Sequence, residues 1–291
     1  GLNGQFRTPR HIVALITEMM APGPNDEICD PACGTAGFLV SAASYVSRTH
    51  ADTLSSLTLT QVPSFENGAF HGFDFDSTML RIASMNMLLH GVKAPDIRYH
   101  DSLSESLADA AGRYSLILSN PPFAGSLDYE ATAKDLLSVV KTKKTELLFL
   151  ALALKLLKPG GRAAIIVPDG VLFGSSKAHL DLRRHLIEEN RLDAVVKLPP
   201  GTFRPYAGIS TSILFFTKAA SGGTDNVWFY EVTADGWTLD DRRRPLLDGS
   251  KLGPTPSAPL TRLEHDRNNL PDVVDRWARR EGSEQHRKRT E

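Results

Sequence analysis

The segment Asn120-Pro121-Pro122-Phe123 places an amide, two prolines and an aromatic ring directly after a strand-like run over residues 114–119. The Asn120 side-chain oxygen and the Pro121 carbonyl are two acceptors. They suit the hydrogens of an amine whose lone pair is delocalised into a ring, as in adenine. The prolines stiffen the loop and remove competing N–H donors, and Phe123 offers a face for a flipped base. An ordinary proline-rich turn could have the same composition. What favours a catalytic role for this segment is its position beside a second candidate site.

That second site is a loop of small residues, Asp-Pro-Ala-Cys-Gly-Thr-Ala-Gly over residues 30–37, between a predicted strand (27–30) and a predicted helix (38–46). Small residues let a backbone approach a ligand closely. The loop lacks the third glycine of the dinucleotide fingerprint and begins with an acid. An acid beside a helix N-terminus suits a zwitterionic amino acid better than a pyrophosphate. The methionine part of S-adenosylmethionine is such a ligand; an ordinary strand-to-helix turn is the alternative.

Two further acids stand where predicted strands end. Asp74 follows the strand at 69–73 and suits ribose hydroxyls, and Asp101 follows the strand at 97–100 and suits an adenine amino group. Ligands in open α/β sheets bind at the carboxyl ends of the strands, so three acids are expected to meet in one cleft. Each of them alone also fits a solvated loop acid.

Strands and helices alternate along the chain, which predicts an α/β fold with a doubly wound, mostly parallel sheet. Strands are also expected at 163–167 and 192–198, with helices at 146–157 and 177–189. The last two strands, 210–217 and 227–232, follow each other without a long helix, which favours an antiparallel hairpin at the edge. We expect a catalytic domain over residues 1–232. Residues 233–291 are expected to form a loosely packed extension with a short helix near 273–280.

Composition limits the kinds of partner, metal site and cellular compartment that the chain can have. Lys and Arg number 33 against 34 Asp and Glu, so the chain carries no global basic signature and any DNA contact needs a local patch or a partner. Cys29 and Cys33 cannot complete a zinc site or a disulfide framework, which predicts a reduced, cytoplasmic protein without metal. No apolar run reaches the ~20 residues of a membrane span, and no signal peptide is evident. The chain starts at Gly1 without Met, which we interpret as a piece of a longer polypeptide.

The loop at 30–37 with Asp74 and Asp101 resembles the cofactor motifs of class I, Rossmann-like methyltransferases. Because these motifs precede the Asn-Pro-Pro-Phe loop, and residues 4–9 (Gly-Gln-Phe-Arg-Thr-Pro) precede both, the order is similar to gamma-type N6-adenine DNA methyltransferases. The resemblance implies S-adenosylmethionine as cofactor and Asn120, Pro121, Pro122 and Phe123 as catalytic residues. The cofactor residues it implies are Phe6, Thr8, Pro9, Asp30, Pro31, Gly34, Thr35, Gly37, Asp74, Phe75, Asp101 and Ser102.

Over residues 4–232 the chain resembles the methylation subunit of type I restriction-modification systems. The stretches that carry this resemblance most specifically are residues 85–91, 168–173, 210–216 and 235–240. The resemblance implies DNA as substrate, with a specificity subunit and a restriction subunit as partners and no membrane. It also implies that Phe203, with Tyr206 as alternate, supplies a second aromatic against the target base. Either ring also fits core packing.

Two alternatives remain open at this stage. Asn-Pro-Pro-aromatic loops also serve methyltransferases of protein glutamine and of RNA. A scaffold subunit that binds the cofactor without transferring a methyl group is the other class, and the intact loop at 120–123 argues against it. No Pro-Cys dipeptide occurs, so the thiol route of cytosine-C5 methylation has no nucleophile. Lysines between 134 and 144 are candidates for phosphate contacts or an ordinary solvated loop.

Overall fold

The central feature is one eight-stranded sheet with the strand order β3-β2-β1-β4-β5-β7-β6-β8. The computed structural model describes residues 7–52, 68–103, 105–123, 130, 132–221 and 223–280. The strands are β1 (Ile28–Asp30), β2 (Phe70–Asp74), β3 (Asp96–Tyr99), β4 (Tyr114–Ser119), β5 (Leu157–Pro168), β6 (Arg191–Lys197), β7 (Thr211–Thr217) and β8 (Trp228–Glu231). Among them β7 alone runs antiparallel to its neighbours, so the predicted doubly wound, mostly parallel α/β fold is confirmed.

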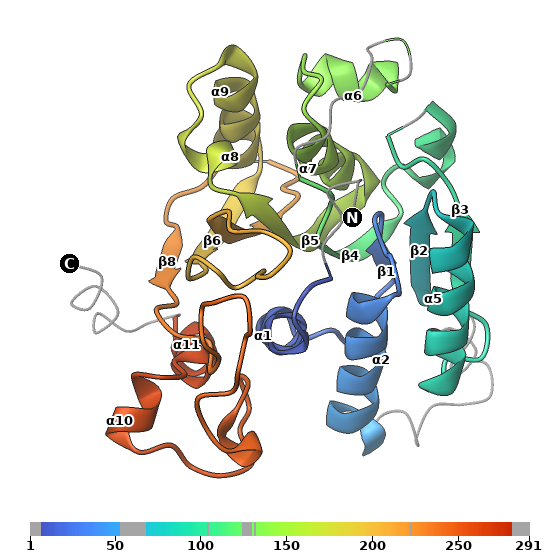
Figure 1. Cartoon of the computed structure of the whole chain (residues 1–291). Helices are drawn as coiled ribbons and strands as arrows, with labels where there is room; N and C mark the ends of the chain where they lie inside the picture. The colour runs from blue at the N-terminus through green and yellow to red at the C-terminus, as the bar shows by residue number, and fades with distance from the viewer. Residues whose placement is uncertain are drawn as a thin grey trace.

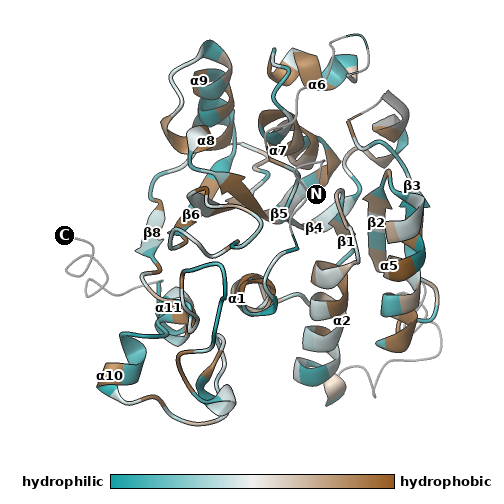
Figure 2. Ribbon diagram, in the orientation of Figure 1, coloured by the Kyte–Doolittle hydropathy of each residue, from teal (hydrophilic) through white to brown (hydrophobic). Residues whose placement is uncertain are grey.

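Helices cover both faces of this sheet (Figure 1). One layer holds α1 (Arg10–Met20), α2 (Gly37–Thr49), α5 (Ser77–Leu89) and α11 (Leu270–Ala278); the other holds α6 (Lys134–Val139), α7 (Thr145–Leu156), α8 (Gly170–Phe173) and α9 (Lys177–Arg184). The remaining helical turns are η1 (Glu105–Ala110), η2 (His185–Glu189), η3 (Gly249–Lys251) and α10 (Arg262–His265). In the hydropathy colouring of Figure 2, hydrophobic residues gather along the central strands and α7.

Strand β4 shows how the sequence builds two cores. Its side chains alternate between faces, because successive residues of a strand point to opposite sides. Leu116 and Leu118 join the core under α1 and α2, whereas Ile117 joins the core under α7. All residues of β4 are buried, as expected of a central strand covered on both faces.

The antiparallel strand does not lie where the sequence predicted it. Residues 210–217 and 227–232 were expected to pair as an edge hairpin, but β7 is inserted between β5 and β6, and β8 pairs in parallel with β6. The position is therefore a correction. Its physical reason is that residues of β7 from Thr211 to Phe216 are buried on both faces, which requires neighbours on either side.

Residues 233–280 are also more tightly packed than the sequence suggested. Helix α11 lies against α1, with Leu270, Val273 and Trp277 in the same core as α1 and α2. The Trp277 indole N–H donates to the Met19 carbonyl at 2.7 Å. The expectation of a loose extension is corrected for this stretch, because its apolar side chains cover a face of α1 that would otherwise meet water.

Candidate active site

Asp30 ends β1 at the carboxyl edge of the sheet and is almost fully buried, with 1% of its surface exposed. Its Oδ1 accepts from the Ser119 hydroxyl at 2.7 Å and from the Ala32 backbone N–H at 3.0 Å. Burial removes the water that would stabilise the charged form, and this effect outweighs the two hydrogen bonds. As a result, the pKa of Asp30 is raised from 3.8 to about 7.

The loop after Asp30 contains two residues in the left-handed conformation and borders open space. Gly34 has a φ of +50° and Ala36, which caps α2, a φ of +62°. A side chain built at Gly34 or Gly37 would meet no atom within 4 Å, so the loop borders open space at both positions. Across it, the Asn86 amide of α5 donates to the Thr35 carbonyl at 2.8 Å. The loop is thus a cradle with room for a ligand beside its backbone.

Asp74 and Ser102 fasten this loop from neighbouring strands. Asp74 is the last residue of β2 and accepts from the Gly34 and Asp76 N–H groups at 3.0 and 2.9 Å. Ser102, also buried, donates its hydroxyl to the Pro31 carbonyl. Both residues are predicted from the sequence to bind the cofactor; what the structure shows is that they hold the loop in position.

The other predicted cofactor residues lie around this cradle. Asp101 is exposed two residues beyond β3 and accepts from the Leu103 N–H at 3.1 Å. Phe75 is 46% exposed next to Asp74, which leaves its ring open to solvent at the carboxyl edge. Phe6 lies outside the described residues.

The Asn120 loop follows β4 and is joined to this cradle on two sides. Ser119, the last residue of β4, donates to Asp30, and the Asn120 amide nitrogen donates to the Thr8 hydroxyl at 3.0 Å. Thr8 and Pro9 stand immediately before α1. Because the Asn120 amide nitrogen donates to Thr8, the orientation of the amide is fixed. The side-chain oxygen of Asn120 then points away from Thr8, where it can act as a hydrogen-bond acceptor. On the other side of the loop, the Pro122 carbonyl accepts from the Thr145 hydroxyl at 3.4 Å.

Two aromatic rings stand behind this loop. Phe123 and Phe203 are buried, with 3% and 1% of their surface exposed, and their rings meet edge to face at 6.4 Å between centroids. Tyr206 is 63% exposed. A pocket of about 310 Å³ opens here, lined by Thr8, Pro9, Phe203, Tyr206 and residues of the C-terminal stretch. The structure therefore brings Phe203 and Thr8 to one cavity.

Sequence reasoning missed Ser119 and Asn86, which position the two loops. Ser119 directly precedes the Asn120 motif, so its place at the end of β4 was available as a signal. Asn86 falls within a stretch noted only for its resemblance, and no local pattern points its amide at Thr35.

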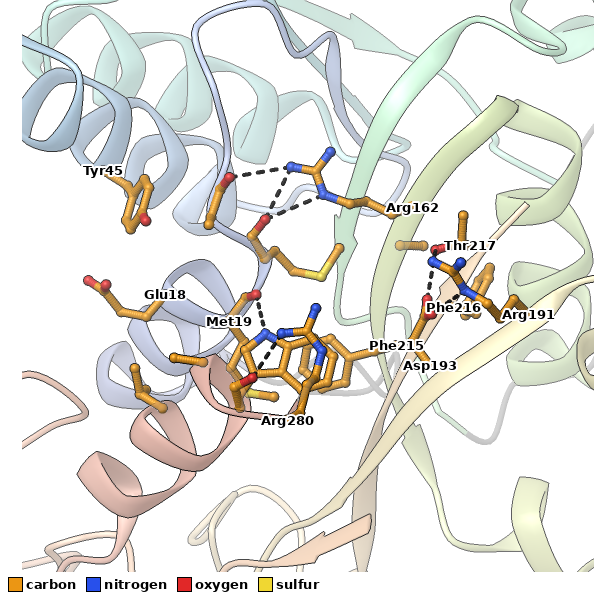
Figure 3. Close-up of a pocket in the computed structure, with 16 residues that line it drawn as sticks. Glu18, Met19, Tyr45, Arg162, Arg191, Asp193, Phe215, Phe216, Thr217 and Arg280 are labelled. Atoms are coloured by element: carbon orange, nitrogen blue, oxygen red, sulfur yellow. Dashed lines mark hydrogen bonds and ion pairs between the residues drawn. The ribbon is translucent and has the colours of Figure 1, made fainter. Parts of the chain in front are cut away.

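A second cavity, of about 500 Å³, is lined mainly by residues of α1, α11, β5, β6 and β7. Figure 3 shows its walls. Its walls include Arg162 near the beginning of the paired part of β5 and Arg191 at the first residue of β6. These side chains are engaged: Arg162 donates to the Met20 carbonyl at 3.1 Å, and Arg191 pairs with Asp193 at 2.6 Å. The larger cavity is thus remote from Asp30 and Asn120 and presents structural ion pairs.

Strand order, the acid-led loop after β1 and the polar loop after β4 together define the Rossmann-like fold of class I methyltransferases. The model of the N-6 DNA methylase family matches residues 1–251, and the chain belongs to that family. S-adenosylmethionine is the cofactor that goes with this family and fold. No helix among the described residues has the length and apolar character needed to cross a membrane.

Similar proteins come from type I restriction enzymes. The EcoEI methylase subunit of Escherichia coli is 36% identical over 233 residues, 79% of this chain and 45% of that protein. The EcoKI methylase subunit of Escherichia coli K12 is 34% identical over 258 residues, 84% of this chain and 47% of that protein. The crystal structure of the EcoKI M protein matches with a TM-score of 0.73 at 31% identity, covering 84% of this chain and 52% of that one. The chain therefore spans about half the length of the curated relatives it matches.

The residues present fit the cofactor. A buried carboxylate, a helix N-terminus and open space beside Gly34 and Gly37 form a donor and acceptor set for an ammonium group, a carboxylate and an adjoining nucleoside. The thiol of Cys33, packed within this loop, has a raised pKa because it is buried. It therefore stays protonated and serves packing.

Proposed function

We propose that this chain transfers a methyl group from S-adenosylmethionine to the exocyclic N6 of adenine in DNA, as the catalytic core of a type I modification subunit. The observation that carries the proposal is the pair of hydrogen bonds that joins the two loops: Ser119 to Asp30, and Asn120 to Thr8. They fix an acceptor-rich loop beside a cradle suited to the methyl donor. The similarity to methylase subunits of type I restriction enzymes supports this choice of reaction.

In this proposal the Asn120 oxygen and the Pro121 carbonyl accept hydrogen bonds from the two N6 hydrogens. Accepting both turns the nitrogen lone pair out of the ring and toward the methyl group. The cofactor, when bound, supplies a methyl group already activated as a sulfonium. The new N–C bond forms as the C–S bond breaks, and the surplus proton leaves N6 for solvent. Positioning then supplies most of the rate.

The remaining site residues have positioning and binding roles in the same proposal. Asp30 receives the ammonium group of the cofactor, and the loop from Pro31 through Gly34, Thr35 and Gly37 borders its methionine part. Asp74, Phe75, Asp101 and Ser102 bind or support the nucleoside part, and Phe6, Thr8 and Pro9 cover the methionine end.

Phe123 is proposed to stack on the extruded adenine. Phe203, which is buried and packed edge to face against Phe123, holds that ring or contacts the base from the same wall. Tyr206, on the rim of the pocket, is the alternate partner for the base.

The proposal extends to the assembly. A net charge of −1 and the lack of a recognition motif in the sequence favour a separate specificity subunit that reads the DNA site, with a restriction subunit joining the complex. We place the catalytic unit in residues 1–232, with the packed stretch after it as an extension. Two free, buried cysteines fit a reducing, cytoplasmic setting.

The test is direct detection of N6-methyladenine, by nuclease digestion and mass spectrometry, in DNA incubated with the chain, S-adenosylmethionine and the specificity subunit of the same system. Wild-type chain is expected to produce it and Asn120→Ala to lose it while still binding cofactor in calorimetry. A glutamine peptide or RNA methylated in preference to DNA would overturn the choice of substrate. Cofactor binding without transfer in the full complex would instead identify a scaffold.

A further inference from the structure

The 310 Å³ pocket beside the Asn120 loop has an unusual charge. It is lined by Arg7, Arg10, Arg204 and Arg243, and none of the described residues that line it is acidic. This concentration of positive charge contrasts with a net charge of −1 for the whole chain. A local basic patch is therefore found beside the candidate active site, apart from the lysines between 134 and 144 that the sequence offered.

Two of these arginines are held in place and two are not. Arg204 pairs with Asp241 at 2.6 Å, and Arg243 pairs with the buried Asp235. Arg7 and Arg10 are exposed and form no ion pair with any residue that the structure describes. Exposed guanidinium groups without a carboxylate partner are available to an anion, and their planar fork matches phosphate oxygens.

The wall behind them is rigid. Asp235, with no exposed surface, bonds the His11 ring at 3.0 Å, and that ring stacks on Trp237 with centroids 3.9 Å apart. The Arg243 guanidinium also donates to the Thr238 carbonyl at 2.9 Å. A wall built this way holds its shape without a ligand, which lowers the ordering cost of binding.

The pocket also touches the catalytic loop. Thr8 lines it and accepts from the Asn120 amide, and Phe203 lines it and packs on Phe123. An adenine that reaches Asn120 must leave the base stack by rotation about its backbone, so its two flanking phosphates stay next to the extruded nucleotide. Arg7 and Arg10 line the pocket on either side of Thr8 and Pro9.

We propose that Arg7 and Arg10 bind the phosphodiester groups flanking the extruded adenine, and that Arg204, steadied by Asp241, completes the site. This inference rests on the proposed function, because it places the target strand at the Asn120 loop. The contacts are independent of base sequence and hold the strand while another component reads it.

The test uses a G·C duplex whose single adenine faces an abasic site, so that one base is easily extruded. Binding to the chain, with S-adenosylmethionine present, is measured by fluorescence anisotropy between 50 and 200 mM salt. The variants are Arg7→Gln, Arg10→Gln and their combination. Arg262→Gln is the matched control, since Arg262 is exposed on α10 and does not line the pocket. A second duplex carries neutral methylphosphonates on both sides of the adenine.

Each phosphate contact contributes a salt slope of about 0.9, which is about a threefold loss of affinity over that fourfold salt range. The double variant is expected to lower the slope by about 2, and Arg262→Gln to leave it unchanged. Methylphosphonates should weaken wild-type binding and have little further effect on the double variant. Unchanged slopes, an equal effect from Arg262→Gln, or fully additive losses would each overturn the phosphate site.

Methyl transfer to the same duplex separates the two hypotheses. If methyl transfer is observed but the double variant has the same salt slope as the wild type, the phosphate site is contradicted and the proposed function is not. Absence of N6-methyladenine in DNA incubated with the chain, S-adenosylmethionine and the specificity subunit contradicts the proposed function, whatever the slopes show.

Discussion

Replacing Asp30 with Asn is expected to stabilise the cofactor-free protein while weakening cofactor binding. Asn keeps an Oδ1 that can accept from Ser119 and Ala32, as the carboxylate does at 2.7 and 3.0 Å. It removes a charge that is 1% exposed. The substitution therefore separates the electrostatic cost of the site from its hydrogen-bond geometry.

The magnitude follows from the raised pKa of Asp30. Folding moves this pKa from 3.8 to about 7, and each pKa unit corresponds to about 1.4 kcal/mol, so ionised Asp30 costs the folded state at most about 4 kcal/mol. Below pH 4 both states are protonated and the cost is absent. It grows as the pH rises from 4 to 7, because the unfolded state loses its proton first, and it is constant above 7.

Thermal or urea unfolding at pH 5, 6, 7 and 8 measures this effect. Asp30→Asn should gain most over wild type at pH 8 and progressively less toward pH 5. Asp109→Asn, which changes an exposed carboxylate, should show no such trend. A variant that is less stable than wild type at pH 8 would refute the reasoning, since burial of the charge would then not dominate.

Cofactor binding should move in the opposite direction. In the proposed site the ammonium group of S-adenosylmethionine pairs with the ionised Asp30 carboxylate. Wild-type affinity is therefore expected to rise with pH up to about 7, the pKa of Asp30, and then level off. Asp30→Asn removes a charge-assisted hydrogen bond worth about 1.5–3 kcal/mol, which is about 10- to 150-fold in affinity. Calorimetry should show this loss together with a flat pH profile.

Four further substitutions test the loops and the packing. Ala36→Gly relieves a left-handed residue at φ +62° and should raise the free energy of unfolding by about 1 kcal/mol, whereas Gly34→Ala at φ +50° should lower it by about 1 kcal/mol; urea titration compares the two. Asn120→Ala should reduce the rate of methyl transfer by about 100-fold or more in single-turnover assays, with calorimetric cofactor affinity unchanged. Trp277→Ala should cost about 3 kcal/mol in one cooperative unfolding transition; two separate transitions would show that α11 folds apart from α1.

Much of the fold could be predicted because local patterns and global packing agree. Alternating strands and helices, and turns rich in glycine and proline, predicted the doubly wound sheet up to β6. The place of β7 required long-range pairing. The run from Ile213 to Phe216 is continuously apolar, which is typical of a strand covered on both faces, while Trp228 to Glu231 alternates between half-buried and exposed as an edge does. The short connection between β7 and β8 suggested a hairpin, but the burial of β7 on both faces places it between β5 and β6 in the sheet.

The sequence predicted which residues belong to the candidate site, but not most of the hydrogen bonds between them. Asp30 and Asn120 stand at strand ends, where topology alone brings them to one edge of the sheet. The bond from Ser119 to Asp30 and the use of Asp74 to hold the Gly34 N–H depend on side-chain geometry across strands. Spacing along the chain carries no information about such bonds.

The C-terminal stretch shows the limit of composition most clearly. Rich in Asp, Arg and Pro, it read as a loose extension, yet Asp235 is fully buried because His11 and Arg243 surround it. These partners hold the pKa of Asp235 below its usual range despite burial. Since His11 is in the first turn of α1 and Arg243 lines the pocket beside Thr8, this buried carboxylate links residues after 233 to the wall of the candidate active site. Asp235→Asn should therefore weaken DNA binding at the pocket as well as lower stability, although Asp235 itself touches neither substrate nor cofactor.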